Sequence, residues 1–152
     1  MSSAKKILVI GTYDTKDDEL DFLAGIIGNQ GGQVVTMDVS VLGDPSKPTD
    51  YSKHAVAEEG GSSIQAAIDS CDENQAMQIM ARGASLLAAR LYTAGVFDGV
   101  ILLGGTMGTD LALDVTSALP LGVPKYIVST VAFSPLIPAE RLAADTQMIL
   151  WA

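Results

Sequence analysis

Short runs of aliphatic residues alternate along this chain with longer stretches in which apolar residues recur at helical spacing. Two of these runs, residues 6–10 and 97–103, stop at a glycine and are typical of strands buried on both faces of a sheet. The strands predicted in this way cover residues 6–10, 33–39, 97–103, 124–129 and 146–151.

The stretches between these runs predict helices. The first has apolar residues at Leu20, Leu23 and Ile26–Ile27 behind a first turn that holds three acids, and the Gly31-Gly32 pair ends it. The longest pattern, residues 72–92, has one apolar face and is capped by Gly95. The remaining predictions are a helix over residues 54–69 with a break at Gly60-Gly61, a helix over 111–119, a helical turn at 139–144 and a loop over 44–51.

The order of these elements predicts an α/β fold. Strands alternate with helical crossovers, which implies a parallel sheet with right-handed connections. We expect one three-layer domain over residues 1–152, with a mostly parallel five-stranded sheet of Rossmann-like or flavodoxin-like order 2-1-3-4-5. The first and third strands are then neighbours where the winding reverses, and ligands bind beyond the carboxyl ends of such strands.

Composition agrees with this fold and limits the partners. Hydrophobic residues make up 48% of the 152 residues and aromatic residues only 5%, so small aliphatic side chains must fill the core. The formal net charge of -9 disfavours binding to nucleic acid or to an anionic membrane. We expect a cytoplasmic protein, because residues 1–6 lack the apolar part of a secretory signal and no apolar run reaches the roughly 20 residues of a membrane span.

Two glycine- and threonine-rich loops, residues 11–17 and 104–109, follow the first and third predicted strands. Their backbone N–H groups, hydroxyls and glycines suit a phosphate, because donors can point inward without a Cβ in the way. Lys16 adds a positive charge, and Asp14 offers oxygens to Mg²⁺. With the two hydroxyls that end the fourth strand, the candidate binding residues are Gly11, Thr12, Asp14, Thr15, Lys16, Gly104, Gly105, Thr106, Gly108, Thr109, Ser129 and Thr130.

Each of these features also has an ordinary structural explanation. A glycine after a strand often only forms a tight turn, and threonine or aspartate there often only caps a helix. Neither loop matches the Walker or GxGxxG pattern. Ser129 and Thr130 either donate hydrogen bonds to a ligand or cap the next loop. Asp38, at the end of the second strand, either holds ribose hydroxyls, as acids do there in dinucleotide folds, or forms a turn.

The sequence supports binding better than turnover. His54, the one histidine, has no partner for a metal site and is interpreted as a solvated loop residue. Cys71, the one cysteine, is interpreted as an inert thiol, and Met77 and Met80 as core packing. No Ser-His-Asp set or metal-ligand cluster emerges, so the sequence gives no catalytic residue and leaves open whether the protein is an enzyme.

Several segments together resemble one family of uncharacterised bacterial, fungal and plant proteins, which includes the ATP-binding N-terminal domain of the tomato mosaic virus resistance protein. Residues 11–16 resemble its GT-x-DTK signature. Residues 98–109 resemble its DGVIGLGGSGGT segment, with Met107 where the family usually has a small residue. Residues 54–60, 119–125 and 129–132 resemble its HEVA, LP-x-G-x-PK and STVAS segments, and Phe133 replaces a small residue after the last of these.

The resemblance covers essentially the whole chain and implies ATP binding and dimer formation. Family members are longer, so it also implies that this chain is the first half of a two-subdomain architecture. We therefore expect a module that binds ATP, with Mg²⁺, and that forms a homo-oligomer or packs against the missing C-terminal subdomain. The phosphates would lie between the helices that follow Lys16 and Gly108. The alternative is an interaction or regulatory module whose nucleotide pocket is vestigial, which the absence of a catalytic set favours.

Overall fold

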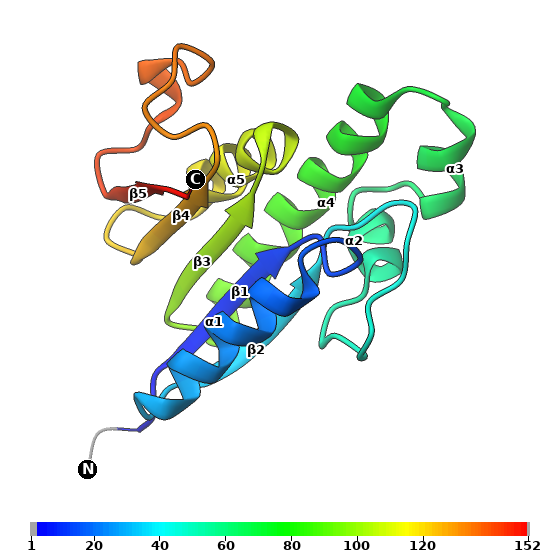
Figure 1. Cartoon of the computed structure of the whole chain (residues 1–152). Helices are drawn as coiled ribbons and strands as arrows, with labels where there is room; N and C mark the ends of the chain where they lie inside the picture. Colours follow the sequence, from blue (N-terminus) through cyan, green and yellow to red (C-terminus); the bar gives the residue numbers. More distant parts are fainter. Residues whose placement is uncertain (1–2, 152) are drawn as a thin grey trace.

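The computed structural model describes residues 3–151, and these residues form a parallel sheet (Figure 1). Its strands are β1 (Lys6–Gly11), β2 (Gln33–Asp38), β3 (Gly99–Gly104), β4 (Lys125–Ser129) and β5 (Thr146–Leu150). They lie in the order β2-β1-β3-β4-β5, and each neighbouring pair is parallel. The fold class and the strand order predicted from the aliphatic runs are confirmed.

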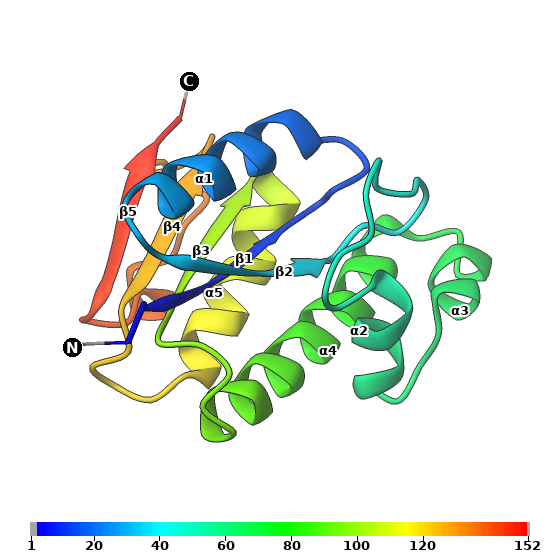
Figure 2. The same cartoon turned by 90° about the horizontal axis from the view of Figure 1, so that it is seen from below.

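Helices cover both faces of the sheet (Figure 2). Helix α1 (Asp17–Asn29) lies on one face, whereas α4 (Glu73–Thr93) and α5 (Thr106–Ala118) lie on the other. The break predicted at Gly60-Gly61 separates two short helices, α2 (Lys53–Glu59) and α3 (Ile64–Asp69), which pack against α4. A short 3₁₀ turn, η1 (Ala139–Arg141), stands where a helical turn was predicted.

The larger of two hydrophobic cores fills the space between the sheet and the α4–α5 layer. Leu8, Met80 and Leu111 are fully buried there. A smaller core lies under α1, with Val9 and Leu20 fully buried in it. Because burying one such side chain stabilises the fold by about 1.5–3 kcal/mol, the larger core anchors α4 and α5 firmly on the sheet.

Helix α5 begins earlier than the sequence pattern predicts. The pattern predicted residues 111–119, but the helix starts at Thr106, directly after strand β3 and the N-cap residue Gly105. The turn is this sharp because the backbones of Gly104 and Gly108 touch: a Cβ on Gly104 would lie 2.5 Å from the Gly108 carbonyl carbon. Most of the predicted second loop is therefore the first turn of α5.

The segment at residues 119–125 also has a structural explanation. Lys125 is buried at the start of β4, and its ammonium donates to Asp145 Oδ2 at 2.7 Å and to the Pro120 carbonyl oxygen at 2.9 Å. The Gly122 N–H donates to the same carboxylate at 2.8 Å. The hydrogen bonds from Lys125 and Gly122 lower the pKa of Asp145 below its usual value. This ion pair ties the α5–β4 connection to the segment that leads into β5.

Candidate functional site

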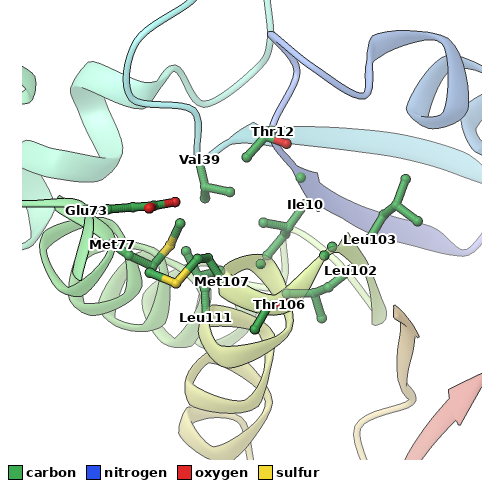
Figure 3. A pocket seen from close by; sticks show the side chains of 14 residues that line it. Ile10, Thr12, Val39, Glu73, Met77, Leu102, Leu103, Thr106, Met107 and Leu111 are labelled. Carbon is green, nitrogen blue, oxygen red and sulfur yellow. The ribbon is translucent and has the colours of Figure 1, made fainter. Parts of the chain in front are cut away.

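The carboxyl ends of β1 and β3 open into a cavity of about 310 Å³, here called the switch-point cavity (Figure 3). Gly11 and Thr12 at the end of β1 form one wall, and the opposite wall consists of residues 102–108 from β3 and the first turn of α5. The two predicted loops therefore meet at one site, as the strand order requires.

A second cavity of about 560 Å³ lies beside the first, and we call it the crossover cavity. Thr15 of the first loop, Leu42 of the segment after β2, Ile68 of α3 and Cys71 before α4 all line it. Both volumes fall within the range of about 300–1,000 Å³ that is typical of small-molecule sites. The two cavities share four wall residues, which are Thr12, Val39, Glu73 and Met77.

The glycines of the two loops are of two kinds. Close packing explains why glycine is needed at positions 104 and 11. A Cβ on Gly104 would meet the Gly108 backbone, and a Cβ on Gly11 would lie 2.8 Å from a methyl carbon of Leu20. Packing does not explain Gly105 or Gly108, because their nearest neighbours would be the Thr130 hydroxyl at 3.7 Å and the Leu103 carbonyl oxygen at 3.8 Å. Neither has a positive φ, yet both line the switch-point cavity.

The two helix N-termini at this edge differ in charge. The first turn of α1 carries Asp17, Asp18 and Glu19, whereas that of α5 carries no acidic residue. The first N–H groups of any α-helix lack partners within the helix, and no side chain of the described residues caps α5. Thr109 N–H is the first to bond within the helix, to the Gly105 carbonyl oxygen at 2.8 Å. An anion is therefore favoured at the α5 end and disfavoured at the α1 end.

The first loop contributes wall residues to both cavities. Thr12 lines both, and its hydroxyl lies 2.9 Å from the hydroxyl of Thr15. Asp14 and Thr15 line the crossover cavity. Lys16 lines neither, because its ammonium lies 4.6 Å from the centroid of the Trp151 ring, a cation–π contact. A role for Lys16 at a bound phosphate would require another rotamer.

The hydroxyls predicted at the second loop take different positions. Thr109 and Ser129 are buried, and their hydroxyl oxygens lie 2.6 Å apart, so they tie α5 to the end of β4. Neither lines a cavity, and the Val131 N–H also donates to the Ser129 hydroxyl at 3.1 Å. Thr106 lines the switch-point cavity, while Thr130 is exposed just beyond Gly105.

A buried carboxylate network joins the first loop to the segment after β2. Asp38 is 1% exposed, and its Oδ1 accepts hydrogen bonds from the N–H groups of Tyr13, at 3.3 Å, and Ser40, at 2.9 Å. The structure thus places Asp38 at the end of β2, where its carboxylate binds the backbone of residues 13 and 40, and in the wall of neither cavity. Burial, with the Asp38 charge second, raises the pKa of Tyr13 well above its usual value, so the phenol stays protonated. Its hydroxyl donates to the Val9 carbonyl oxygen at 3.3 Å.

Residues 5–150 match the N-terminal domain of an uncharacterised protein family, UPF0261. The chain belongs to this family. It is 56% identical over 151 residues to a UPF0261 protein of Brucella suis biovar 1 and 39% identical over 128 residues to one of Clostridium tetani. It is also 30% identical over 148 residues to the ToMV susceptible protein tm-1(GCR26) of Solanum lycopersicum. These alignments cover 99%, 84% and 86% of this chain.

The family resemblance noted in the motifs is thereby confirmed. The chain spans only part of each relative: 36% of the Brucella suis protein, 32% of the Clostridium tetani protein and 19% of the tomato protein. In each of these relatives, the segment that matches this chain is one region of a longer protein.

Three cavity residues of this UPF0261 domain were missed by the sequence interpretation. Val39, Glu73 and Met77 line both cavities, although Met77 was interpreted as core and Glu73 was not singled out. In Figure 3, Glu73 and Met77 reach from α4 toward the space below Thr12, and Met107 lies beside Met77. The spacing of Glu73 and Met77 places them on one helix face, but only the packing of α4 shows that this face meets the switch point.

Asp14 is the residue that fits a bound cation best. Its Oδ2 accepts from the Gly43 N–H at 3.1 Å, but its Oδ1 is buried and has no hydrogen-bond partner among the described residues. Such an oxygen suits a donor or a hard cation such as Mg²⁺. Within residues 3–151 no group of three or more histidine, cysteine or acidic side chains could hold a metal ion, so Asp14 would act without a second protein carboxylate, thiolate or imidazole cluster.

None of the helices in that range is apolar and long enough to span a membrane.

Proposed function

We propose that this UPF0261 domain binds a nucleotide of the ATP type, with its phosphates in the switch-point cavity against the first turn of α5. The observation that carries the proposal is the pair Gly105 and Gly108. Neither packing nor backbone conformation requires glycine at these positions, and both line the cavity beside the free N–H groups of the helix. A bound phosphate supplies the missing reason, because it must approach the backbone without a Cβ in the way.

The charges around the cavities favour a nucleotide that carries Mg²⁺. None of the described residues that line them is a lysine or arginine, whereas Asp14, Asp72 and Glu73 are acidic. A free triphosphate would be repelled by these carboxylates, and a bound Mg²⁺ reduces that repulsion. Asp14 lines the crossover cavity, two residues after Thr12, which belongs to both cavities, and it would hold the ion there. When bound, Mg²⁺ would neutralise part of the phosphate charge.

Calorimetric titration tests this proposal. MgATP should bind with saturation at one site per chain, and removal of Mg²⁺ with a chelator should weaken binding by about tenfold or more, since one charge-assisted contact is worth about 1.5–3 kcal/mol. Absence of any binding by ATP, with or without Mg²⁺, would favour the alternative of an interaction or regulatory module with a vestigial pocket. The two methionines in the cavity wall, Met77 and Met107, are the feature that supports that alternative.

We further propose that this chain self-associates through the face of the sheet that carries α1. On that face α1 packs over β1 and β2, and the side of β3 and β4 beyond it forms an apolar hollow of about 510 Å³. Phe22, 68% exposed, and Trp151 line this hollow. An exposed apolar area of this kind commonly binds a partner. In longer relatives, the remainder of the chain would compete with a second copy for this hollow.

Light scattering coupled to size-exclusion chromatography measures this association. The chain should elute with the mass of a dimer, and Phe22→Glu should convert it to a monomer because a buried unpaired charge is costly. Leu121→Glu is the matched control, since Leu121 is 80% exposed in the connection after α5 and does not line the hollow. A monomeric parent chain at high concentration would contradict self-association.

A further inference from the structure

The switch-point cavity and the crossover cavity are adjacent compartments of one cleft. Thr12, Val39, Glu73 and Met77 belong to the walls of both. A ligand whose charged end lies against the first turn of α5 would therefore extend past these four side chains into the crossover cavity. The two compartments differ in chemistry, so the two ends of that ligand must differ as well.

The crossover cavity suits an uncharged, partly apolar group. Its walls include the apolar side chains of Val41, Leu42, Ile68 and Met77. Its charged residues are the acids Asp14, Asp72 and Glu73, which disfavour a second anion. A purine or pyrimidine base has apolar faces that pack on such side chains and polar edges that bind acceptors.

Glu73 occupies the boundary between the two compartments. It begins α4, and its carboxylate projects into the space between α4 and Val39 (Figure 3). No cation of residues 3–151 forms an ion pair with it. Asp38 ends the second strand, where an acid binds the ribose in dinucleotide folds. In this chain its carboxylate instead accepts hydrogen bonds from the N–H groups of Tyr13 and Ser40. Glu73 is thus the carboxylate available where a ribose would join phosphate to base.

We infer that the crossover cavity binds the nucleoside half of the ligand, with Glu73 accepting hydrogen bonds from the ribose hydroxyls. This inference rests on the proposed nucleotide function, in which the phosphates lie at the α5 N-terminus. It assigns a specificity-determining role to Glu73, because a carboxylate that binds hydroxyls distinguishes a ribonucleotide from an inorganic polyphosphate or a deoxy analogue.

Calorimetry on the Glu73→Gln variant tests the inference, because the affinity for MgATP and the affinity for magnesium triphosphate should change in different directions. If Glu73 binds ribose, the substitution weakens MgATP binding by about tenfold or more. The affinity for magnesium triphosphate, which has no ribose, should stay the same or increase because a nearby negative charge is removed. The parent chain should bind 2′,3′-dideoxy-ATP more weakly than ATP, and in the variant the two nucleotides should bind alike.

Each failure has a distinct pattern. If MgATP and magnesium triphosphate both bind the parent chain and Glu73→Gln strengthens both equally, Glu73 is only a neighbouring charge and the inference is overturned while the phosphate site stands. If neither ligand binds the parent chain, the proposed function fails and this inference fails with it. Glu58→Gln is the matched control, because Glu58 is an exposed helical acid that lines neither cavity and should change no affinity.

Cys71 provides an independent reporter of occupancy. It is exposed, it is the one cysteine of the sequence, and it lines the crossover cavity but not the switch-point cavity. Saturating MgATP should slow its alkylation by N-ethylmaleimide several-fold, whereas saturating magnesium triphosphate should not. Equal rates with and without bound MgATP, or equal protection by both ligands, would show that the nucleoside does not occupy the crossover cavity.

Discussion

Replacing Gly108 with valine is expected to remove nucleotide binding while leaving the domain folded. A Cβ at this position would have no neighbour closer than 3.8 Å, so the fold accommodates it. The added side chain would occupy the switch-point cavity beside the first N–H groups of α5. We expect at least about 100-fold weaker MgATP binding by calorimetry, which corresponds to losing two hydrogen bonds to a charged group at about 1.5 kcal/mol each.

Gly25→Val is the matched control for this result. Gly25 is a helical glycine of α1 with nothing within 4 Å of its Cβ position, and it lines neither cavity. This variant should bind MgATP like the parent chain, and both variants should keep the circular dichroism spectrum of the parent. A folded Gly108→Val variant with undiminished affinity would place the phosphates elsewhere.

The second large effect is structural: Gly83→Ala should destabilise the domain by more than about 3 kcal/mol, the upper end of ordinary overpacking. Gly83 lies in α4 where α2 crosses it, and a Cβ there would overlap the Val56 carbonyl oxygen of α2. The obstacle is backbone, so no side-chain rotation relieves it, and α2 must move off α4. The free energy of unfolding from urea titration measures the loss.

Gly28→Ala is the control for the Gly83 prediction. Gly28 is also helical, but nothing lies within 4 Å of its Cβ position. Alanine should therefore stabilise α1 by about 0.5–1 kcal/mol, because glycine loses more chain entropy on folding. If Gly83→Ala proves as harmless as Gly28→Ala, then α2 and α4 are not in close backbone contact.

The sheet could be predicted because the residues that form each strand are adjacent in the sequence. The two central strands contain continuous aliphatic runs, residues 7–10 in β1 and 100–103 in β3, and right-handed crossovers then restrict the strand order. The same logic placed Gly11 and Gly104 at one edge, where the structure has them. Motif and period therefore brought the two loops to one cavity from the sequence alone.

Which residues line the two cavities depends on tertiary packing, and no local sequence pattern predicts that packing. The prediction put the start of α5 at Leu111 because the glycines at 104–108 are typical of a loop, whereas close backbone contact makes residues 106–108 a helical turn. Glu73 and Met77 enter the site because α4 docks with its N-terminal end over the switch point. Lys16, predicted to supply the cation, instead lies against Trp151, which is distant in sequence.

The most direct test of the nucleotide site is an amide ¹H–¹⁵N NMR titration of this chain with MgATP. The account predicts that the largest shifts fall on the N–H groups of Gly105, Thr106, Met107 and Gly108. The N–H groups of Asp17, Asp18 and Glu19, at the acidic start of α1, should change little. Largest shifts at the α1 N-terminus, or no shifts at saturating MgATP, would contradict the assignment of the phosphate site to α5.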